Sequence, residues 1–123
     1  MEVRVPDATT TGMPYVVEVD GDIDIATVDD LEEPVISAIR QGRQPVILDL
    51  SECVFMDSSG IRLLLRAHRA LQADGNGHVR LLAVIARDHV AGLLRLTSVD
   101  KVIPVVASRG EAEGFLAAPV DGR

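Results

Sequence analysis

Hydrophobic positions along the chain switch between the two-residue period of strands and the three-to-four-residue period of helices. Tyr15, Val17 and Val19 alternate with Val16 and Glu18, which predicts a strand with one face toward a core. The continuous, mostly apolar run Pro45–Leu50 is typical of a central parallel strand covered on both faces. Including these two, strands are predicted at Val3–Val5, Tyr15–Val19, Asp22–Ile25, Pro45–Leu50, His78–Ile85 and Lys101–Val106.

Helical periodicity fills the intervals between the later strands. Helices are predicted at Ala26–Gln41, Ser58–Asp74, Arg87–Thr97 and Glu111–Ala117. The second of these has the clearest pattern, with a predicted buried stripe of Ile61, Leu64, Leu65, His68 and Leu71. Its predicted outer strip is basic and consists of Arg62, Arg66 and Arg69.

The first helix carries an apolar face and an interruption. Its face is made of Val28, Leu31, Val35 and Ile39. Thr27 is predicted to cap its N-terminus, and Gly42 follows its C-terminus as a good C′ residue. Pro34 falls inside the helix, where a proline removes a hydrogen bond, so we expect a kink there.

Strands that alternate with helices after an opening pair of strands predict an α/β fold. We expect a mixed, mostly parallel sheet of four to five strands, packed with about four helices. No internal repeat or linker divides the chain, so we expect one domain over residues 1–123. Its ordered core is predicted to span about 15–116, between a short N-terminal edge strand and a frayed tail at 119–123.

Composition excludes several classes of function. The chain has 123 residues, 12 basic and 19 acidic residues, and a net charge of −7, which disfavours binding to nucleic acid or to anionic membranes. No signal peptide or membrane span is recognised, so we expect a cytoplasmic protein. Cys53 is the one cysteine and is predicted to be a small core residue. Metal-ligand spacing and a glycine-rich phosphate loop are lacking, so we expect no metal and no cofactor.

The candidate site is the sequence Asp57-Ser58-Ser59-Gly60, which lies between a predicted strand and the clearest helix. In an open α/β sheet, function gathers at the carboxyl ends of the strands. Free backbone N–H groups at a helix N-terminus tolerate negative charge, including a phosphate on Ser58. Taken alone, the tetrapeptide is more typical of an ordinary helix cap than of a functional site.

The sequence around this motif resembles the STAS family, and more narrowly its bacterial anti-sigma factor antagonists. The resemblance rests on the apolar strand Val46 to Ser51, the motif Phe55 to Gly60 and the leucine-rich helix Ile61 to Leu71. A glycine–aspartate turn at 21–24 also matches, and the similarity covers roughly residues 15–116.

The resemblance implies partner switching. In that mechanism, the unphosphorylated antagonist binds an anti-sigma factor serine kinase and thereby releases a sigma factor. Phosphorylation at the position of Ser58 reverses binding, and a phosphatase restores it; stress responses use such switches. Residues expected at the partner surface are Asp22, Asp24, Thr27, Asp57, Ser59, Gly60 and Arg62. Asp57 is expected to orient the Ser58 hydroxyl and to join Asp22 and Asp24 in an acidic rim.

Three alternative functions make different demands on the sequence. A serine-nucleophile enzyme needs a base beside Ser58, and the pattern places none of the histidines there, so we expect no enzyme activity. A phospho-receiver domain needs two strand–helix units between its acidic residues, whereas one separates the cluster at 20–24 from Asp57. A STAS domain that is never phosphorylated, as an accessory module of a transporter, lipid-trafficking or signalling complex, stays open as the alternative function.

Overall fold

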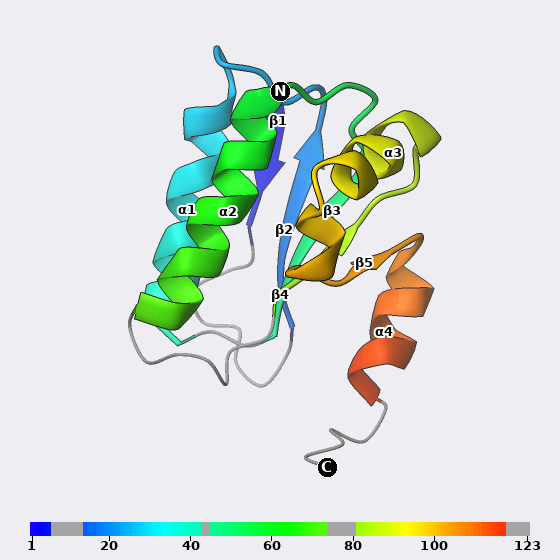
Figure 1. Ribbon diagram of the computed structural model, residues 1–123. Helices are drawn as coiled ribbons and strands as arrows, with labels where there is room; N and C mark the ends of the chain where they lie inside the picture. Colours follow the sequence, from blue (N-terminus) through cyan, green and yellow to red (C-terminus); the bar gives the residue numbers. More distant parts are fainter. Residues whose placement is uncertain (6–13, 43–44, 74–80, 118–123) are drawn as a thin grey trace.

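The computed structural model describes residues 1–5, 14–42, 45–73 and 81–117 (Figure 1). Its strands are β1 (Glu2–Arg4), β2 (Tyr15–Asp20), β3 (Val46–Glu52), β4 (Leu81–Val84) and β5 (Val105–Val106). Its helices are α1 (Val28–Arg40), α2 (Ser58–Ala73), α3 (Asp88–Leu96), the short 3₁₀ helix η1 (Val99–Lys101) and α4 (Arg109–Ala117).

The five strands form a single sheet in the order β1-β2-β3-β4-β5. β1 runs antiparallel to β2, and every later pair is parallel. Each parallel pair is joined by a helical crossover, as the alternation of strand and helix patterns predicts. The predicted α/β fold with a mixed, mostly parallel sheet is therefore confirmed.

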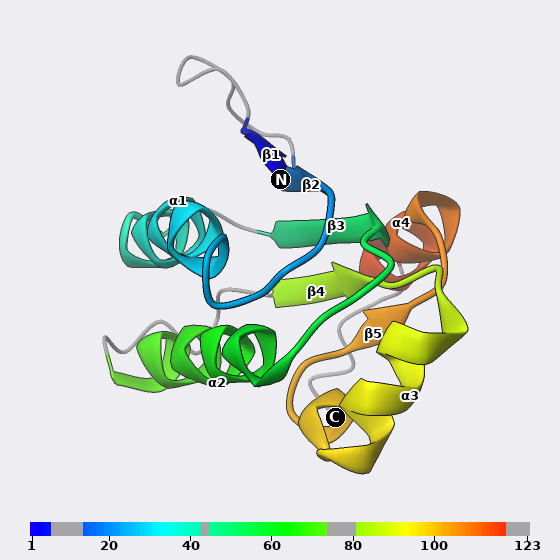
Figure 2. The ribbon, with the colours of Figure 1, turned by 90° about the horizontal axis from the view of Figure 1, so that it is seen from above.

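Two apolar layers enclose the sheet. α1 and α2 lie together on one face, and α4 lies on the other (Figures 1 and 2). The larger core combines the inward side chains of β2, β3 and β4 with those of α1, α2 and α3. The smaller core joins Ile47, Leu82 and Val84 of the sheet to Ala112 of α4. The predicted alternation in β2 is confirmed, because Val17 and Val19 belong to the larger core while Glu18 faces the opposite side.

α1 matches its predicted apolar face, since Val28, Leu31, Val35 and Ile39 are all buried. The helix continues through Pro34 to Arg40. Gly42 follows with a φ of 74° and donates its backbone N–H to the Ile39 carbonyl oxygen at 3.0 Å. A residue with a side chain is strained in that left-handed conformation, so glycine suits this helix end.

The predicted buried stripe of α2 is partly wrong. The buried residues are Ser59, Gly60, Leu63, Leu64 and Ala67, while Leu65 is 37% exposed. His68 is half-buried, and Ile61 and Leu71 pack at the margin of the core. The buried face includes the small residues Gly60 and Ala67, which a hydrophobic period does not mark. The basic outer strip of Arg62, Arg66 and Arg69 is exposed as predicted.

Other boundaries differ from the predicted ones. Lys101–Val106 does not form one strand, because η1 ends at Lys101 and β5 contains only Val105–Val106. Asp22–Ile25 forms a single parallel bridge, between Ile23 and Met56, rather than a strand. Residues 78–80 and the predicted frayed tail at 119–123 lie outside the described residues. Within the described ranges, no helix is both long and apolar enough to cross a membrane.

Candidate functional site

Two loops meet at the carboxyl ends of β2 and β3. We call residues 21–27 the first site loop and residues 53–57 the second site loop. The Ile23 backbone N–H donates to the Phe55 carbonyl oxygen at 3.0 Å, and the Asp57 N–H donates to the Ile23 carbonyl oxygen at 3.1 Å. These bonds extend the parallel pairing of β2 and β3 beyond the strands. The loops are therefore held together before any partner binds.

Side chains of the first site loop reinforce this junction. Asp22 Oδ1 accepts the Phe55 backbone N–H at 3.1 Å, which ties the first site loop to the second. Asp24 Oδ1 accepts the N–H groups of Ala26 at 2.9 Å and Thr27 at 3.1 Å. Two of the predicted acidic residues therefore shape the surface as well as charging it.

Thr27 does not cap α1 with its side chain, contrary to the prediction. Its Oγ1 accepts the Asp24 N–H at 3.0 Å and donates to the Asp22 carbonyl oxygen at 3.0 Å. The hydroxyl therefore bonds backbone groups of its own loop instead of an N–H of the first helical turn. Ser and Thr side chains often form such local bonds to the backbone. Thr27 thus holds the first site loop in shape.

Asp57 caps α2. Its Oδ1 accepts the Ser59 N–H at 2.8 Å, and its backbone carbonyl accepts the Gly60 N–H at 3.0 Å. Within the described part of the chain, the Ser58 hydroxyl has no hydrogen-bond partner. The expectation that Asp57 orients this hydroxyl is therefore not met in this structure. The carboxylate instead fixes the helix end on which Ser58 stands.

Three consecutive residues of the motif differ sharply in environment. Ser58 is exposed, Ser59 is only 7% exposed, and Gly60 is buried against the second site loop. A Cβ on residue 60 would overlap Met56 Cγ and lie 2.7 Å from Met56 Sδ and 3.2 Å from Ile23 Cγ2. Glycine at this position lets α2 begin directly beneath both loops.

Basic side chains continue from the motif along α2. Arg62 is exposed and lies one turn after Ser58. Among the described residues it forms no ion pair, whereas Arg66 is paired with Glu32 of α1 at 2.8 Å. Arg62 is therefore an uncompensated cation beside an acidic surface.

Apolar and aromatic side chains are also exposed around the site, and no pattern in the sequence predicted their exposure. Ile25 is 77% exposed in the first site loop, and Phe55 is 43% exposed in the second. His89 of α3 stacks on Phe55, with ring centroids 6.4 Å apart and planes inclined by 16°. No periodic signal relates residue 89 to residue 55, because the contact depends on where the third crossover places α3.

Cys53 begins the second site loop and is buried. Its Sγ donates to the Phe55 carbonyl oxygen at 3.2 Å. Burial raises the pKa of this thiol, partly opposed by backbone hydrogen bonds. The prediction of a small core residue is confirmed.

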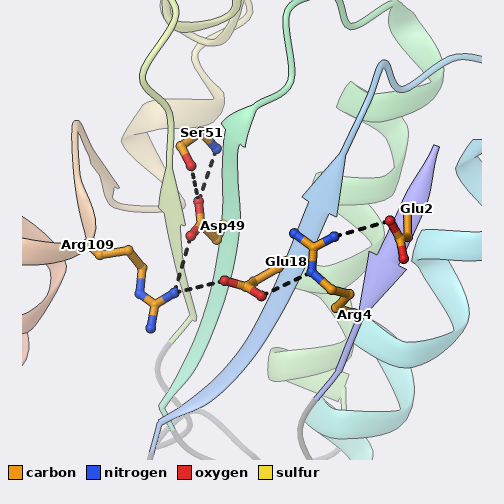
Figure 3. A network of polar contacts seen from close by, with 6 residues as sticks. All are labelled: Glu2, Arg4, Glu18, Asp49, Ser51 and Arg109. Atoms are coloured by element: carbon orange, nitrogen blue, oxygen red, sulfur yellow. Dashed lines mark hydrogen bonds and ion pairs between the residues drawn. The ribbon is translucent and has the colours of Figure 1, made fainter.

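A separate polar network lies on the sheet face opposite α1 and α2 (Figure 3). Asp49 is only 7% exposed, and its Oδ1 accepts both the Ser51 hydroxyl at 2.6 Å and the Ser51 N–H at 3.0 Å. Its Oδ2 meets Arg109 Nη1 at 3.3 Å, and the same nitrogen lies 3.4 Å from Glu18 Oε2. The chain of contacts then continues to β1 through Arg4 and Glu2. The network links the start of α4 to three strands and lies apart from the site loops.

The described residues hold no group of three or more His, Cys, Asp or Glu side chains arranged to bind a metal ion. The arrangement at the loops is instead an exposed hydroxyl on a rigid, acidic and partly apolar surface. Comparison of the chain with known proteins identifies its family. The sequence pattern of the STAS domain matches residues 5–112. The chain belongs to the STAS domain family.

Two relatives of this STAS chain, from different Staphylococcus species, have the same name. The anti-sigma-B factor antagonist of Staphylococcus aureus (strain NCTC 8325 / PS 47) is 26% identical over 99 residues, which cover 80% of this chain and 89% of the relative. The anti-sigma-B factor antagonist of Staphylococcus epidermidis is 35% identical over 66 residues, covering 53% of this chain and 61% of the relative.

Solved structures confirm the STAS fold. An anti-sigma factor antagonist from Mycobacterium paratuberculosis superposes with a TM-score of 0.78 at 24% identity, covering 93% of this chain and 92% of the other. The anti-sigma factor antagonist SpoIIAA in its unphosphorylated form superposes with a TM-score of 0.72 at 22% identity. The match covers 94% of this chain and 96% of SpoIIAA. The phosphorylated form of SpoIIAA from Bacillus superposes with a TM-score of 0.67 at 22% identity. That match covers 94% of this chain and 99% of the other. The predicted family resemblance is therefore confirmed.

Proposed function

We propose that this STAS chain, taken as one domain over residues 1–123, is an anti-sigma factor antagonist. Its unphosphorylated form binds an anti-sigma factor serine kinase, and the kinase then releases a sigma factor. Phosphorylation of Ser58 reverses the binding, and a phosphatase that removes the phosphate restores it. The names of the Staphylococcus relatives support the general role.

One observation carries the proposal: the Ser58 hydroxyl is exposed at the first residue of α2 and free of hydrogen-bond partners among the described residues. A kinase substrate has to present its hydroxyl to the active site of the kinase. Asp57 holds the helix end, and the paired loops hold Asp57. The hydroxyl is thus presented on a rigid support.

The surface around Ser58 has the character of a binding surface. Asp22, Asp24 and Asp57 supply negative charge, and Ile25 and Phe55 supply exposed apolar area between them. Interfaces combine apolar anchors with a polar rim in this way. A partner that binds here makes its apolar contact with Ile25 and Phe55, and charged groups surround that contact.

A phosphate on Ser58 changes this surface without a change of fold. It adds about 1.5 to 2 negative charges directly beside the carboxylate of Asp57. Ser58 points to solvent, so the phosphate displaces no core side chain. Release of the partner then follows from altered charge and shape at the interface itself.

The testing experiment is mass spectrometry of the intact protein and its peptides after incubation with ATP and the anti-sigma factor kinases of its host. We expect one phosphoryl group on Ser58, absent in Ser58→Ala and retained in Ser59→Ala, which keeps the exposed hydroxyl. If none of these kinases phosphorylates a chain whose Ser58 is shown to be accessible, the proposal is wrong. A pull-down for a different partner then tests the accessory-module alternative.

A further inference from the structure

We propose that Arg62 binds the phosphate of phosphorylated Ser58 within the first turn of α2. The proposal rests on Ser58 being the phosphorylated residue, and it concerns what the phosphate then contacts. By pairing with it, Arg62 is withdrawn from the surface that faces the partner. Phosphorylation therefore adds an anion and removes an available cation in one step.

The helix geometry brings the two groups together. Ser58 and Arg62 are four residues apart in α2, so their side chains are neighbours on one face of the helix. Cα–Cβ bonds in a helix tilt toward its N-terminus, which leans the Arg62 side chain back toward residue 58. An anionic residue on the N-terminal side of a cationic one is also the more favourable order for such a pair. The planar guanidinium matches phosphate oxygens in a two-pronged contact.

Arg62 is available for this role, whereas the next arginine along the strip, Arg66, is not. Arg66 is already paired with Glu32, and both of its contacts with that carboxylate are 3.0 Å or shorter. Arg62 is exposed and has no ion pair among the described residues. Of the cations along the helix, Arg62 is the one within a turn of Ser58.

The nearby carboxylates do not engage Arg62 either. Asp57 accepts the Ser59 N–H, Asp22 accepts the Phe55 N–H, and Asp24 accepts two N–H groups of its own loop. These acids are held toward the backbone, so none of them is paired with the arginine. A phosphate on Ser58 meets a guanidinium that has no competing intramolecular partner among the described residues.

The experiment places phosphoserine at position 58 during translation, so no kinase is needed. ³¹P NMR then follows the second ionisation of the phosphate against pH in the otherwise unchanged chain and in Arg62→Gln. A nearby cation favours the dianion, so we expect the second pKa of the phosphate to rise by about half a unit when Arg62 is replaced. Asp22, Asp24 and Asp57 are unchanged in both proteins, and their effects cancel in the comparison.

Arg69→Gln is the matched control, because it removes the same charge from the same exposed strip about three turns from Ser58. We expect it to leave the phosphate pKa unchanged. The Arg62 Nε–H resonance of the ¹⁵N-labelled chain should also shift on phosphorylation, while that of Arg69 stays in place. Equal phosphate pKa values with and without Arg62, or an Arg62 resonance that does not move, overturn the proposal. Failure of the proposed function would instead appear in the kinase assay.

Discussion

Ser58, Ser59 and Gly60 show how much adjacent residues differ at the start of α2. One hydroxyl faces solvent, the next is buried, and the glycine fills a space in which a methyl group overlaps Met56. Residues 59 and 60 are both buried, and residue 60 lies against Met56 and Ile23, while residue 58 is exposed. Function and packing therefore make separate demands on neighbouring positions, and each demand can be tested by a single substitution.

Substitutions of Ser58 should separate kinase binding from stability. Ser58→Ala should bind the anti-sigma factor kinase as the unphosphorylated chain does, and Ser58→Asp or Ser58→Glu should bind it weakly because of the added charge beside Asp57. Titration calorimetry measures the affinities. Since residue 58 is exposed, the free energy of unfolding should change by no more than about 1 kcal/mol. Equal affinity for all these variants contradicts the proposed switch.

Gly60→Ala should lower stability although alanine favours helices. The added methyl group meets Met56 and Ile23, and overpacking of this kind costs about 1 to 3 kcal/mol. The gain in helix propensity is about 1 kcal/mol, so we expect a net loss in urea unfolding. Gly92→Ala in α3 is the control, because its nearest contact is 3.8 Å away. That variant should be stabilised, and similar results for the two substitutions refute the packing argument.

At the scale of elements, the turn before α1 depends on its side-chain hydrogen bonds. Asp24 closes this turn by accepting two backbone N–H groups, and Thr27 closes it from the other side. Because this loop is also bonded to the second site loop, its shape affects the surface around Ser58. Loss of one of these side chains should therefore loosen both the turn before α1 and the surface around Ser58.

Asp24→Ala should destabilise the protein by about 1 kcal/mol, because the side-chain hydrogen bonds that close the turn before α1 are lost. Asp29→Ala is the comparison, since Asp29 is an exposed residue of the first turn of α1 whose negative charge favours the helix dipole by about 0.5 kcal/mol. Amide hydrogen exchange should show faster exchange at Ala26 and Thr27 in the first variant only. Unchanged protection at these amides in Asp24→Ala contradicts the role of Asp24 in closing this turn.

Helices and strands were predictable where the hydrophobic residues followed a single helical or strand spacing. The face of α1 and the alternation in β2 follow directly from their spacing, and the structure agrees. In α2, leucines occur on more than one side, so periodicity alone chose Leu65 over Leu63. The buried face of α2 also includes Gly60 and Ala67, small residues that a hydrophobic pattern does not mark. The strand expected from Lys101 was lost to η1, because a continuous apolar spacing does not reveal where tertiary contacts favour a turn.

The candidate site was predictable in position but not in hydrogen bonding. Asp57 to Gly60 mark the strand-to-helix turn in the sequence. The structure places that turn beyond the carboxyl ends of β2 and β3, beside residues 22–24. Thr27 and Asp57 have the right chemistry for several partners, and only the folded backbone decides which N–H each one meets. The contact between Phe55 and His89 carries no local signal, since 34 residues separate them in the sequence.

At the scale of the whole molecule, Cys53 reports on global unfolding. Its thiol is buried in the larger core and its pKa is raised by that burial from a reference value of 9.0. Above about pH 9 the unfolded chain loses the thiol proton while the folded chain keeps it, so the free energy of unfolding should fall as pH rises toward the folded pKa. Urea unfolding between about pH 8 and pH 10 measures this slope. Cys53→Ala should show a smaller fall, and identical slopes would refute the contribution of the thiol.

The described sheet has short outer strands, and this bears on how the protein behaves at high concentration. β1 contains three residues, two of them the charged Glu2 and Arg4, and β5 contains two residues. Long, flat, apolar edges invite other chains to add strands, which leads to aggregates. Edges this short offer few unpaired backbone groups for such growth. An antagonist that works as proposed, by repeated association and release, thus remains free to bind its partner through side chains at one end of the sheet.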